Sequence, residues 1–247
     1  MDDYGASTYG DRVADVYDEM VVEMGLDTEG TVGFLASLAG EGPVLELAIG
    51  TGRIALPLHE RGLQIHGIDA SEAMIAKLRE KPGGADLPVT IGDFAEVGVE
   101  GRYRLIYVVF NTLWALLSQE DQTRCVRNVA EHLTPGGAFV VEAFVPDPAR
   151  FDRGQRIHAR TVASHRVVLE ASTHDPKGQR VSAQQVVFED GGGIRMYPVE
   201  IRYLWPSELD LMARLAGLRL RQRWGGWHGE PYTGEGRHVS VYEPDDR

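Results

Sequence analysis

The stretch Val44-Leu45-Glu46-Leu47-Ala48-Ile49-Gly50-Thr51-Gly52 has the pattern of an apolar strand that ends in a glycine turn. An apolar strand of this kind is typical of a buried parallel sheet. Gly50 and Gly52 allow the backbone to approach a ligand that lies over the carboxyl end of the strand. A second apolar run ends at Asp69, 17 residues after Gly52, where a carboxylate can accept hydrogen bonds from a ribose. The sequence therefore predicts a site for an adenosine-type cofactor.

Strands and helices alternate on both sides of this stretch. The order predicts an α/β fold, with a doubly wound, mostly parallel sheet and helices on both faces. Four β-rich runs between residues 157 and 204, separated by turn sequences, predict an antiparallel sheet inserted after the fifth strand. We therefore expect a helical cap at 1–40, a core at 41–150 and 205–247, and an inserted lid or dimerisation unit at 151–204. The expected helices are 9–24, 29–39, 52–61, 71–81, 119–133 and 206–215, and the expected strands are 44–48, 64–69, 89–91, 105–110, 138–144, 218–224 and 238–242.

Charge and composition narrow the class of partner. The formal net charge is −12, and the first 50 residues hold 11 acids against Arg12 alone. An acidic surface repels phosphate, so nucleic acid and membranes are poor partners and a neutral or cationic small molecule fits better; these acids could equally form a solvated helical face. Cys125 is the single cysteine, which excludes an internal disulfide, and the histidines show no metal-ligand spacing. The start lacks the pattern of a secretory signal, so we expect a cytoplasmic protein.

Several cofactors remain open at this point. The pattern Gly50-x-Gly52-x-x-Ala55 also satisfies the loose dinucleotide fingerprint, so NAD(P) has to be considered, and the glycines could merely form a turn. Glu46 argues against NAD(P) as the cofactor, because a carboxylate facing the cleft would repel a pyrophosphate and attract an ammonium group. Asp93 and Phe94 follow the third strand, where Asp93 can accept from an adenine amine and Phe94 offers an apolar edge.

Four of these motifs together resemble the class I S-adenosylmethionine-dependent methyltransferases, which have a Rossmann-like fold. Residues 46–52 look like their glycine-rich motif, 67–74 their ribose motif, 92–94 their adenine motif and 133–137 the turn before their fifth strand. Ala48 stands where a glycine is common, but alanine is small enough for close approach. The resemblance implies S-adenosylmethionine as cofactor and S-adenosylhomocysteine as product. It places the cofactor against Glu46, Ala48, Gly50, Gly52, Asp69, Ala70, Met74, Asp93, Phe94, Phe110 and Asn111.

The start of the chain narrows the resemblance to a subgroup. Residues 9–18 look like the N-terminal element of small-molecule members, including glycine and amino-sugar N-methyltransferases. In these relatives the element folds over the cofactor, which implies that Tyr9 and Tyr17 lie near its methionine end, and Tyr9 is a candidate catalytic residue. Ordinary amphipathic packing is the alternative for both tyrosines.

Methyl transfer from a sulfonium requires alignment and exclusion of water rather than a nucleophilic triad or a metal. The acceptor should lie beyond the fourth strand, on a floor formed by residues 110–114, where Asn111 could orient it or serve only as a loop cap. The Gly-rich segment 224–232 has the composition of an aromatic lid, in which His228 could accept a proton near neutral pH. The candidate acceptor residues are Trp114, Glu142, Tyr203, Trp227 and His228.

The expected function is methyl transfer by direct displacement to a nitrogen or oxygen of a small molecule. A cofactor-binding sensor without chemistry and an NAD(P) oxidoreductase are the alternatives. The exposed edges of the inserted sheet make a homodimer plausible.

Overall fold

The computed structural model describes residues 4–245 and contains two sheets. The main sheet is seven-stranded, with the order β10-β11-β5-β4-β1-β2-β3. Strands β1 to β5 are parallel, and β11 pairs antiparallel with β5 and β10. The predicted doubly wound sheet is therefore confirmed. Its strands are β1 Val44–Leu47, β2 Ile65–Asp69, β3 Val89–Ile91, β4 Tyr103–Val108, β5 Leu133–Phe144, β10 Leu218–Trp224 and β11 Arg237–Pro244.

Helices cover both faces of the main sheet because its central strands are apolar on both sides. Along β4, Leu105 and Tyr107 belong to one buried cluster and Ile106 and Val108 to the other, which is the alternation expected of a strand. Helices α3 Thr28–Ala39 and α4 Ala55–Glu60 cover the first face, together with Leu78 of α5 Glu72–Arg79. Helices α6 Gln119–His132 and α7 Pro206–Leu215 cover the second face.

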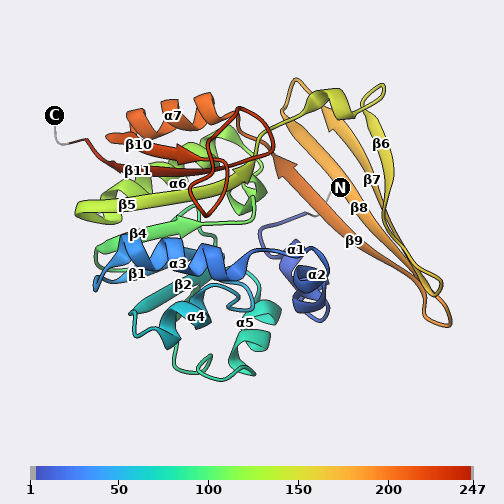
Figure 1. The fold of residues 1–247 in the computed structure, drawn as a ribbon, viewed down its shortest axis with the longest axis horizontal. Helices are drawn as coiled ribbons and strands as arrows, with labels where there is room; N and C mark the ends of the chain where they lie inside the picture. Colours follow the sequence, from blue (N-terminus) through green and yellow to red (C-terminus); the bar gives the residue numbers. More distant parts are fainter. Residues whose placement is uncertain (1–3, 246–247) are drawn as a thin grey trace.

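The inserted segment forms a separate four-stranded antiparallel sheet, as predicted. It stands beside the main sheet, with two short helices between the two sheets (Figure 1). Val168, Val187 and Tyr197 of this inserted sheet form a buried cluster with Val13 and Ala14 from the start of the chain. The sheet is therefore attached to the rest of the molecule through the N-terminal helices. Its strands are β6 Gln155–Val162, β7 Arg166–Asp175, β8 Arg180–Glu189 and β9 Gly193–Arg202.

The N-terminal segment departs from the single helix predicted over residues 9–24. It forms α1 Thr8–Val13 and α2 Tyr17–Glu23, with a break at residues 14–16. Val13 and Tyr17 both pack in the cluster between the sheets. Sequence periodicity missed the break because no Gly or Pro marks it. The fifth strand also begins earlier than predicted, at Leu133 rather than residue 138.

The acids at the start of the chain have partners in α5 and in the residues directly before and after it. Lys77 pairs with Asp15 at 2.8 Å, and Lys81 pairs with Asp18 at 2.6 Å. Asp11 Oδ1 accepts a hydrogen bond from the Ser71 hydroxyl at 2.7 Å. These contacts fasten α1 and α2 to α5, so the negative charge of this segment is in part structural rather than a solvated face. Over residues 4–245, no helix has the length and apolar character needed to span a membrane.

Candidate active site

The backbone at the carboxyl edge of the main sheet leaves room for a ligand. The strand order reverses between β1 and β4, where ligands bind in open α/β sheets. Both strands end in residues with positive φ, including Ala48 at 59° after β1 and Phe110 at 58° after β4. Gly50 has a φ of 55°, and a Cβ placed there would meet nothing within 4 Å. The edge therefore has strained turns and open space where the cofactor site was predicted.

Asp69 closes β2 beside this opening. Its two carboxylate oxygens accept from the backbone N–H of Gly50 at 2.7 Å and of Ser71 at 2.8 Å, which fixes their orientation. Each oxygen retains a lone pair for a ribose hydroxyl. Burial raises the pKa of Asp69, although these backbone N–H groups act in the opposite direction. Asp93 follows β3, is exposed and accepts a hydrogen bond from Ala95 N–H at 2.9 Å. The donor and acceptor set therefore fits a nucleoside.

Glu46 differs from its predicted position facing the cleft. Its carboxylate is 4% exposed and accepts a hydrogen bond from the Tyr107 hydroxyl at 2.8 Å. Burial raises the pKa of Glu46 to about 8, and the hydrogen bond from Tyr107 and the charge of Arg53 oppose this. The side chain is buried because position 46 lies in a central strand, and Tyr107 of the neighbouring strand holds its carboxylate.

Arg53 was missed by sequence reasoning. Its guanidinium lies 5.9 Å from the centre of the Phe110 ring, its Nη1 donates to Thr28 Oγ1 at 3.4 Å, and its charge lowers the pKa of the nearby Tyr17 hydroxyl against the effect of burial. Arg53 therefore joins the glycine turn, the end of β4 and α2, and it is the natural partner there for a carboxylate. Its place directly after Gly52 was the available signal. The predicted Phe94 and Met74 are both buried, Phe94 in the main core and Met74 against the N-terminal helices.

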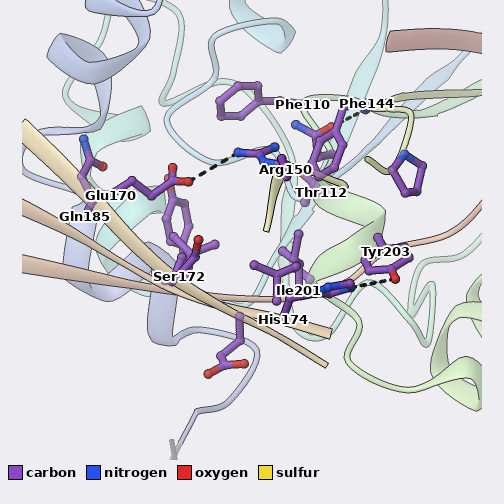
Figure 2. Close-up of a pocket in the computed structure, with 18 of the residues that line it drawn as sticks. Phe110, Thr112, Phe144, Arg150, Glu170, Ser172, His174, Gln185, Ile201 and Tyr203 are labelled. Atoms are coloured by element: carbon purple, nitrogen blue, oxygen red, sulfur yellow. Dashed lines mark hydrogen bonds and ion pairs between the residues drawn. The ribbon is translucent and has the colours of Figure 1, made fainter. Parts of the chain in front are cut away.

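A cavity of about 380 Å³ lies between this edge and the inserted sheet (Figure 2). Four residues predicted to contact the cofactor form part of its wall, namely Tyr9, Tyr17, Phe110 and Asn111. Asn111 has a φ of 62°, and its Oδ1 accepts from Phe144 N–H at 2.6 Å. The side chain of Asn111 therefore holds the ends of β4 and β5 together, which is the loop-cap role considered for it. The same residue also lies on the cavity wall.

The inserted sheet supplies the opposite wall through alternate residues. Strand register places Glu170 beside Gln185, Ser172 beside Ala183, and His174 beside Val181. All six residues line the cavity. Ser172 is 7% exposed, and its Oγ has no hydrogen-bond partner within residues 4–245. A buried hydroxyl without a partner is costly, so this wall is suited to a polar ligand.

Aromatic rings with hydroxyl groups surround the cavity. Tyr203, predicted as an acceptor residue, lines it, and its hydroxyl lies 3.0 Å from His174 Nε2. Phe151 stacks on the His174 ring, with ring centres 4.6 Å apart. Burial raises the pKa of Tyr9 and of Tyr17, so both hydroxyls stay protonated at neutral pH. The cavity thus combines aromatic faces with neutral hydroxyls and one imidazole.

Trp114 and Glu142 were expected to contact the acceptor, but they lie behind the cavity wall. Trp114 is 1% exposed and packs edge-on against Phe144 at 4.0 Å. The Glu142 carboxylate accepts from Phe110 N–H, and its carbonyl accepts from Asn111 N–H at 3.1 Å. These residues position the turn after β4, because the positive φ values there leave N–H groups that need acceptors.

Trp227 and His228 lie at a different place from the one predicted. Trp227 is 7% exposed and packs on Phe34 of α3, with ring centres 5.5 Å apart. His228 Nε2 lies 2.7 Å from Asp27 Oδ2, and Asp27 also caps α3 through Gly30 N–H. Both residues line a shallow depression with Asp27 and Phe34, whereas the large cavity has other walls. The segment is held by core packing, and this corrects the prediction of a flexible lid over the acceptor.

Comparison with known proteins agrees with this geometry. Residues 44–137 match the family model described as "Methyltransferase domain". The chain is 30% identical over 243 residues to a cypemycin N-terminal methyltransferase from Streptomyces sp, covering 95% of this chain and 96% of that protein. It is 27% identical over 229 residues to dTDP-3-amino-3,4,6-trideoxy-alpha-D-glucopyranose N,N-dimethyltransferase from Streptomyces venezuelae, covering 87% and 94%.

A solved structure extends the likeness over the whole chain. The CcbJ methyltransferase from Streptomyces caelestis has a TM-score of 0.92 and 42% sequence identity, over 98% of this chain and 99% of that one. The fold, the carboxyl-edge site and these likenesses define a methyltransferase. The chain belongs to the S-adenosylmethionine-dependent methyltransferase family, and its cofactor is S-adenosylmethionine. The NAD(P) and non-catalytic alternatives are set aside accordingly.

Proposed function

We propose that the enzyme methylates a nitrogen atom of a small-molecule amine held in the cavity between the main and inserted sheets. The relatives are named for N-terminal and amino-sugar N-methylation, which supports nitrogen over oxygen as the acceptor atom. The observation that carries the proposal is the cavity itself, because it reaches from Tyr9 and Phe110 at the cofactor edge to Glu170 and His174 on the inserted sheet. It therefore connects the methyl donor with a polar wall suited to an amine.

The cofactor residues are proposed as follows. Asp69 holds the ribose and Asp93 the adenine amine, while Ala48, Gly50, Gly52 and Ala70 let the backbone approach. Arg53 holds the carboxylate of the methionine moiety. When bound, S-adenosylmethionine supplies an activated methyl group on a sulfonium.

The chain has to align the acceptor nitrogen with this methyl group and exclude water. Tyr9, Tyr17 and Phe110 present aromatic faces at the junction, where a positive charge is stabilised by the ring quadrupole. An amine attacks only in its neutral form, so the acceptor must lose a proton before transfer. His174 lies on the cavity wall with Tyr203 at its Nε2, and its imidazole is the group best placed to accept that proton.

Turnover with matched acceptors tests the proposal. Purified enzyme with S-adenosylmethionine would be given amino sugars and short peptides, each beside an isostere in which a hydroxyl replaces the amine. We expect S-adenosylhomocysteine and a methylated product from at least one amine, and none from its isostere. Product formed only from hydroxyl isosteres would overturn nitrogen as the acceptor atom. The Asp69→Ala variant should need more S-adenosylmethionine to reach the same rate with every acceptor, which would show that the product depends on the bound cofactor.

The inserted sheet is proposed as a lid over the acceptor and, through its edge strand β6, as a contact between two copies of the chain. Ile157 and Val162 of β6 are 74% and 76% exposed, which supports an association along this edge. A cytoplasmic location belongs to the same proposal. Sedimentation of the purified protein would decide between monomer and dimer.

A further inference from the structure

Gln185 is a buried amide side chain without a hydrogen-bond partner. It lies on β8, is 7% exposed and lines the cavity. Within residues 4–245 its side chain makes no hydrogen bond, and its amide atoms are open to the cavity rather than covered by protein. A buried polar group that is left unpaired lowers stability, so nearly all such groups have partners. Exceptions of this kind are expected where a ligand is bound.

Glu170 is the neighbour of Gln185 across the strand pair. The register of β7 and β8 places the two residues directly opposite each other, and both side chains stand on the same side of the sheet (Figure 2). Arg150 Nη2 lies 3.7 Å from Glu170 Oε1, and His158 Nδ1 lies 3.9 Å from the same oxygen. Both separations exceed hydrogen-bond distance. The Glu170 carboxylate therefore keeps its capacity to accept hydrogen bonds, beside the two N–H donors of the Gln185 amide.

Ser172 adds a hydroxyl next to this pair. It lies two residues after Glu170 on β7, so it faces the same side of the sheet. Ser172 is 7% exposed, and its Oγ has no partner within the described part of the chain. Ala183 stands opposite Ser172. This row of small side chains leaves the cavity room beside the long side chains of Glu170 and Gln185.

The charges along the cavity do not strongly favour a ligand of either sign. Among the described residues that line it, three carry carboxylates and two carry guanidinium groups, namely Asp147, Glu170, Glu200, Arg150 and Arg160. A fully charged ligand group would meet both attraction and repulsion here. An uncharged group that offers hydrogen-bond donors and acceptors together fits this wall better.

Two neighbouring hydroxyl groups supply the partners that these side chains lack. The Glu170 carboxylate and Gln185 Oε1 are two acceptors, and each needs a donor of its own. A diol has two O–H donors, and its oxygens also accept from Gln185 Nε2 and Ser172 Oγ. A secondary amide has a single N–H, so it leaves one of the two acceptors unpaired.

We propose that Glu170 and Gln185 form a subsite for two neighbouring hydroxyl groups of the methyl acceptor, with Ser172 as a third partner. One hydroxyl donates to the Glu170 carboxylate and accepts from Gln185 Nε2. The other donates to Gln185 Oε1 and accepts from Ser172 Oγ. The subsite rests on the proposed function, because it assigns the diol to the molecule whose amine is methylated. The enzyme therefore selects amines that also carry a diol.

A purely structural role for Gln185 is the competing explanation. In that case the amide contributes to the packing of β8, and an apolar side chain of similar size would destabilise the sheet. If the amide instead serves a ligand, the unliganded enzyme becomes no less stable when the unpaired group is removed. The melting temperature of the Gln185→Leu variant separates the two explanations.

Matched amines test the subsite by calorimetry on the enzyme saturated with S-adenosylhomocysteine. Cyclohexylamine, 4-aminocyclohexanol and 4-aminocyclohexane-1,2-diol share a ring and an amine and differ in having no, one or two hydroxyl groups. N-(4-aminocyclohexyl)acetamide carries a secondary amide instead. We expect the diol, in its cis or its trans form, to bind more tightly than the other three amines. Its affinity should exceed that of cyclohexylamine by at least about tenfold, because several hydrogen bonds are gained together.

Variants assign this preference to the two residues. Gln185→Leu should reduce the preference for the diol over cyclohexylamine to about twofold or less, with an unchanged or higher melting temperature. Glu170→Gln should reduce it by about three- to tenfold. Gln184→Leu is the matched control and should keep the full preference, because Gln184 is the adjacent residue of β8 and faces the other side of the sheet.

Three outcomes would overturn the subsite. They are equal binding of the amines, tighter binding of the acetamide than of the diol, and a preference for the diol that survives Gln185→Leu. A lowered melting temperature of Gln185→Leu with an unchanged preference would establish the structural role instead.

The same titrations separate this subsite from the proposed function. S-adenosylhomocysteine affinity should be unchanged in both variants, because Glu170 and Gln185 lie on the inserted sheet. A wild-type preference for the diol, together with no methylation of any amine, would contradict the proposed function and leave the subsite in place. Methylation of cyclohexylamine and of the diol with equal affinities would overturn the subsite and leave the proposed function in place.

Discussion

The carboxyl edge of the main sheet and the inner face of the inserted sheet form two sides of one cavity, but they are built differently. At the carboxyl edge, the backbone conformation shapes the site. Ala48, Gly50 and Phe110 have positive φ values, and two backbone N–H groups orient the Asp69 carboxylate. On the inserted sheet, the surface consists of alternate side chains such as Glu170, Ser172 and His174. A site formed by the backbone suits a cofactor that is the same in every reaction. A site formed by side chains can change its ligand through single substitutions.

The two regions should differ most in how much each side chain contributes to stability. Phe139 in β5 is fully buried between the helix layers, whereas Ile157 in β6 is 74% exposed. Phe139→Ala should lower the free energy of unfolding by about 3–5 kcal/mol, because a cavity is left in a tightly packed core. Ile157→Ala should change it by less than about 0.5 kcal/mol. Urea unfolding of both variants measures this, and similar losses would show that the inserted sheet is as tightly packed as the main one.

Acid should destabilise the molecule mainly through the main sheet. His238 in β11 is 1% exposed, and burial lowers its pKa to about 4, assisted by repulsion from Arg223. The unfolded imidazole binds a proton below about pH 6.5, whereas the folded one stays neutral until about pH 4. Stability should therefore fall as the pH decreases through this window, by up to about 3 kcal/mol from this group.

Two glutamine variants assign that loss to one region. His238→Gln should flatten the dependence of unfolding free energy on pH between about 6.5 and 4. His158→Gln, on the inserted sheet, should leave most of it, because the His158 side chain is 32% exposed. If the His158 variant flattens the profile more than the His238 variant, the acid-sensitive group has been placed in the wrong sheet.

Cofactor affinity should depend on the carboxyl edge rather than on the inserted sheet. Asp69→Ala should weaken S-adenosylhomocysteine binding by about 1–3 kcal/mol, because a charged hydrogen-bond acceptor is lost and two backbone N–H groups lose their partner. Glu170→Gln is the control from the inserted sheet and should bind the cofactor product as the unaltered enzyme does. Calorimetry gives both affinities, and unchanged binding by the Asp69 variant would show that this carboxylate does not hold the ribose.

The sequence predicted the carboxyl edge of the main sheet better than it predicted the inserted sheet. The glycine turn at 50–52 and the acid at 69 are a local motif, so the sheet and the cofactor edge were predictable from spacing alone. The acceptor wall has no motif, because Glu170 and Gln185 become neighbours only through the strand register. The sequence placed Glu46 and Glu142 on the right strands, but it could not show which buried hydrogen-bond donors each carboxylate would accept from. Of the predicted acceptor residues, Tyr203 alone lines the cavity.

His228 tests the corrected placement with the smallest expected effect. Its ring pairs with Asp27 at 2.7 Å, but the His228 side chain is 66% exposed, so His228→Gln should reduce stability by no more than about 1 kcal/mol. Methyl transfer should keep its rate and its pH profile, because His228 lies in a depression beside α3 rather than on the cavity wall. His174→Gln, by contrast, should lower the rate and shift the profile, since its imidazole lines the cavity proposed to hold the acceptor. A reversed result, with the pH profile moved by His228→Gln and unmoved by His174→Gln, would restore the lid expected from the sequence and remove the inserted sheet from the proton transfer.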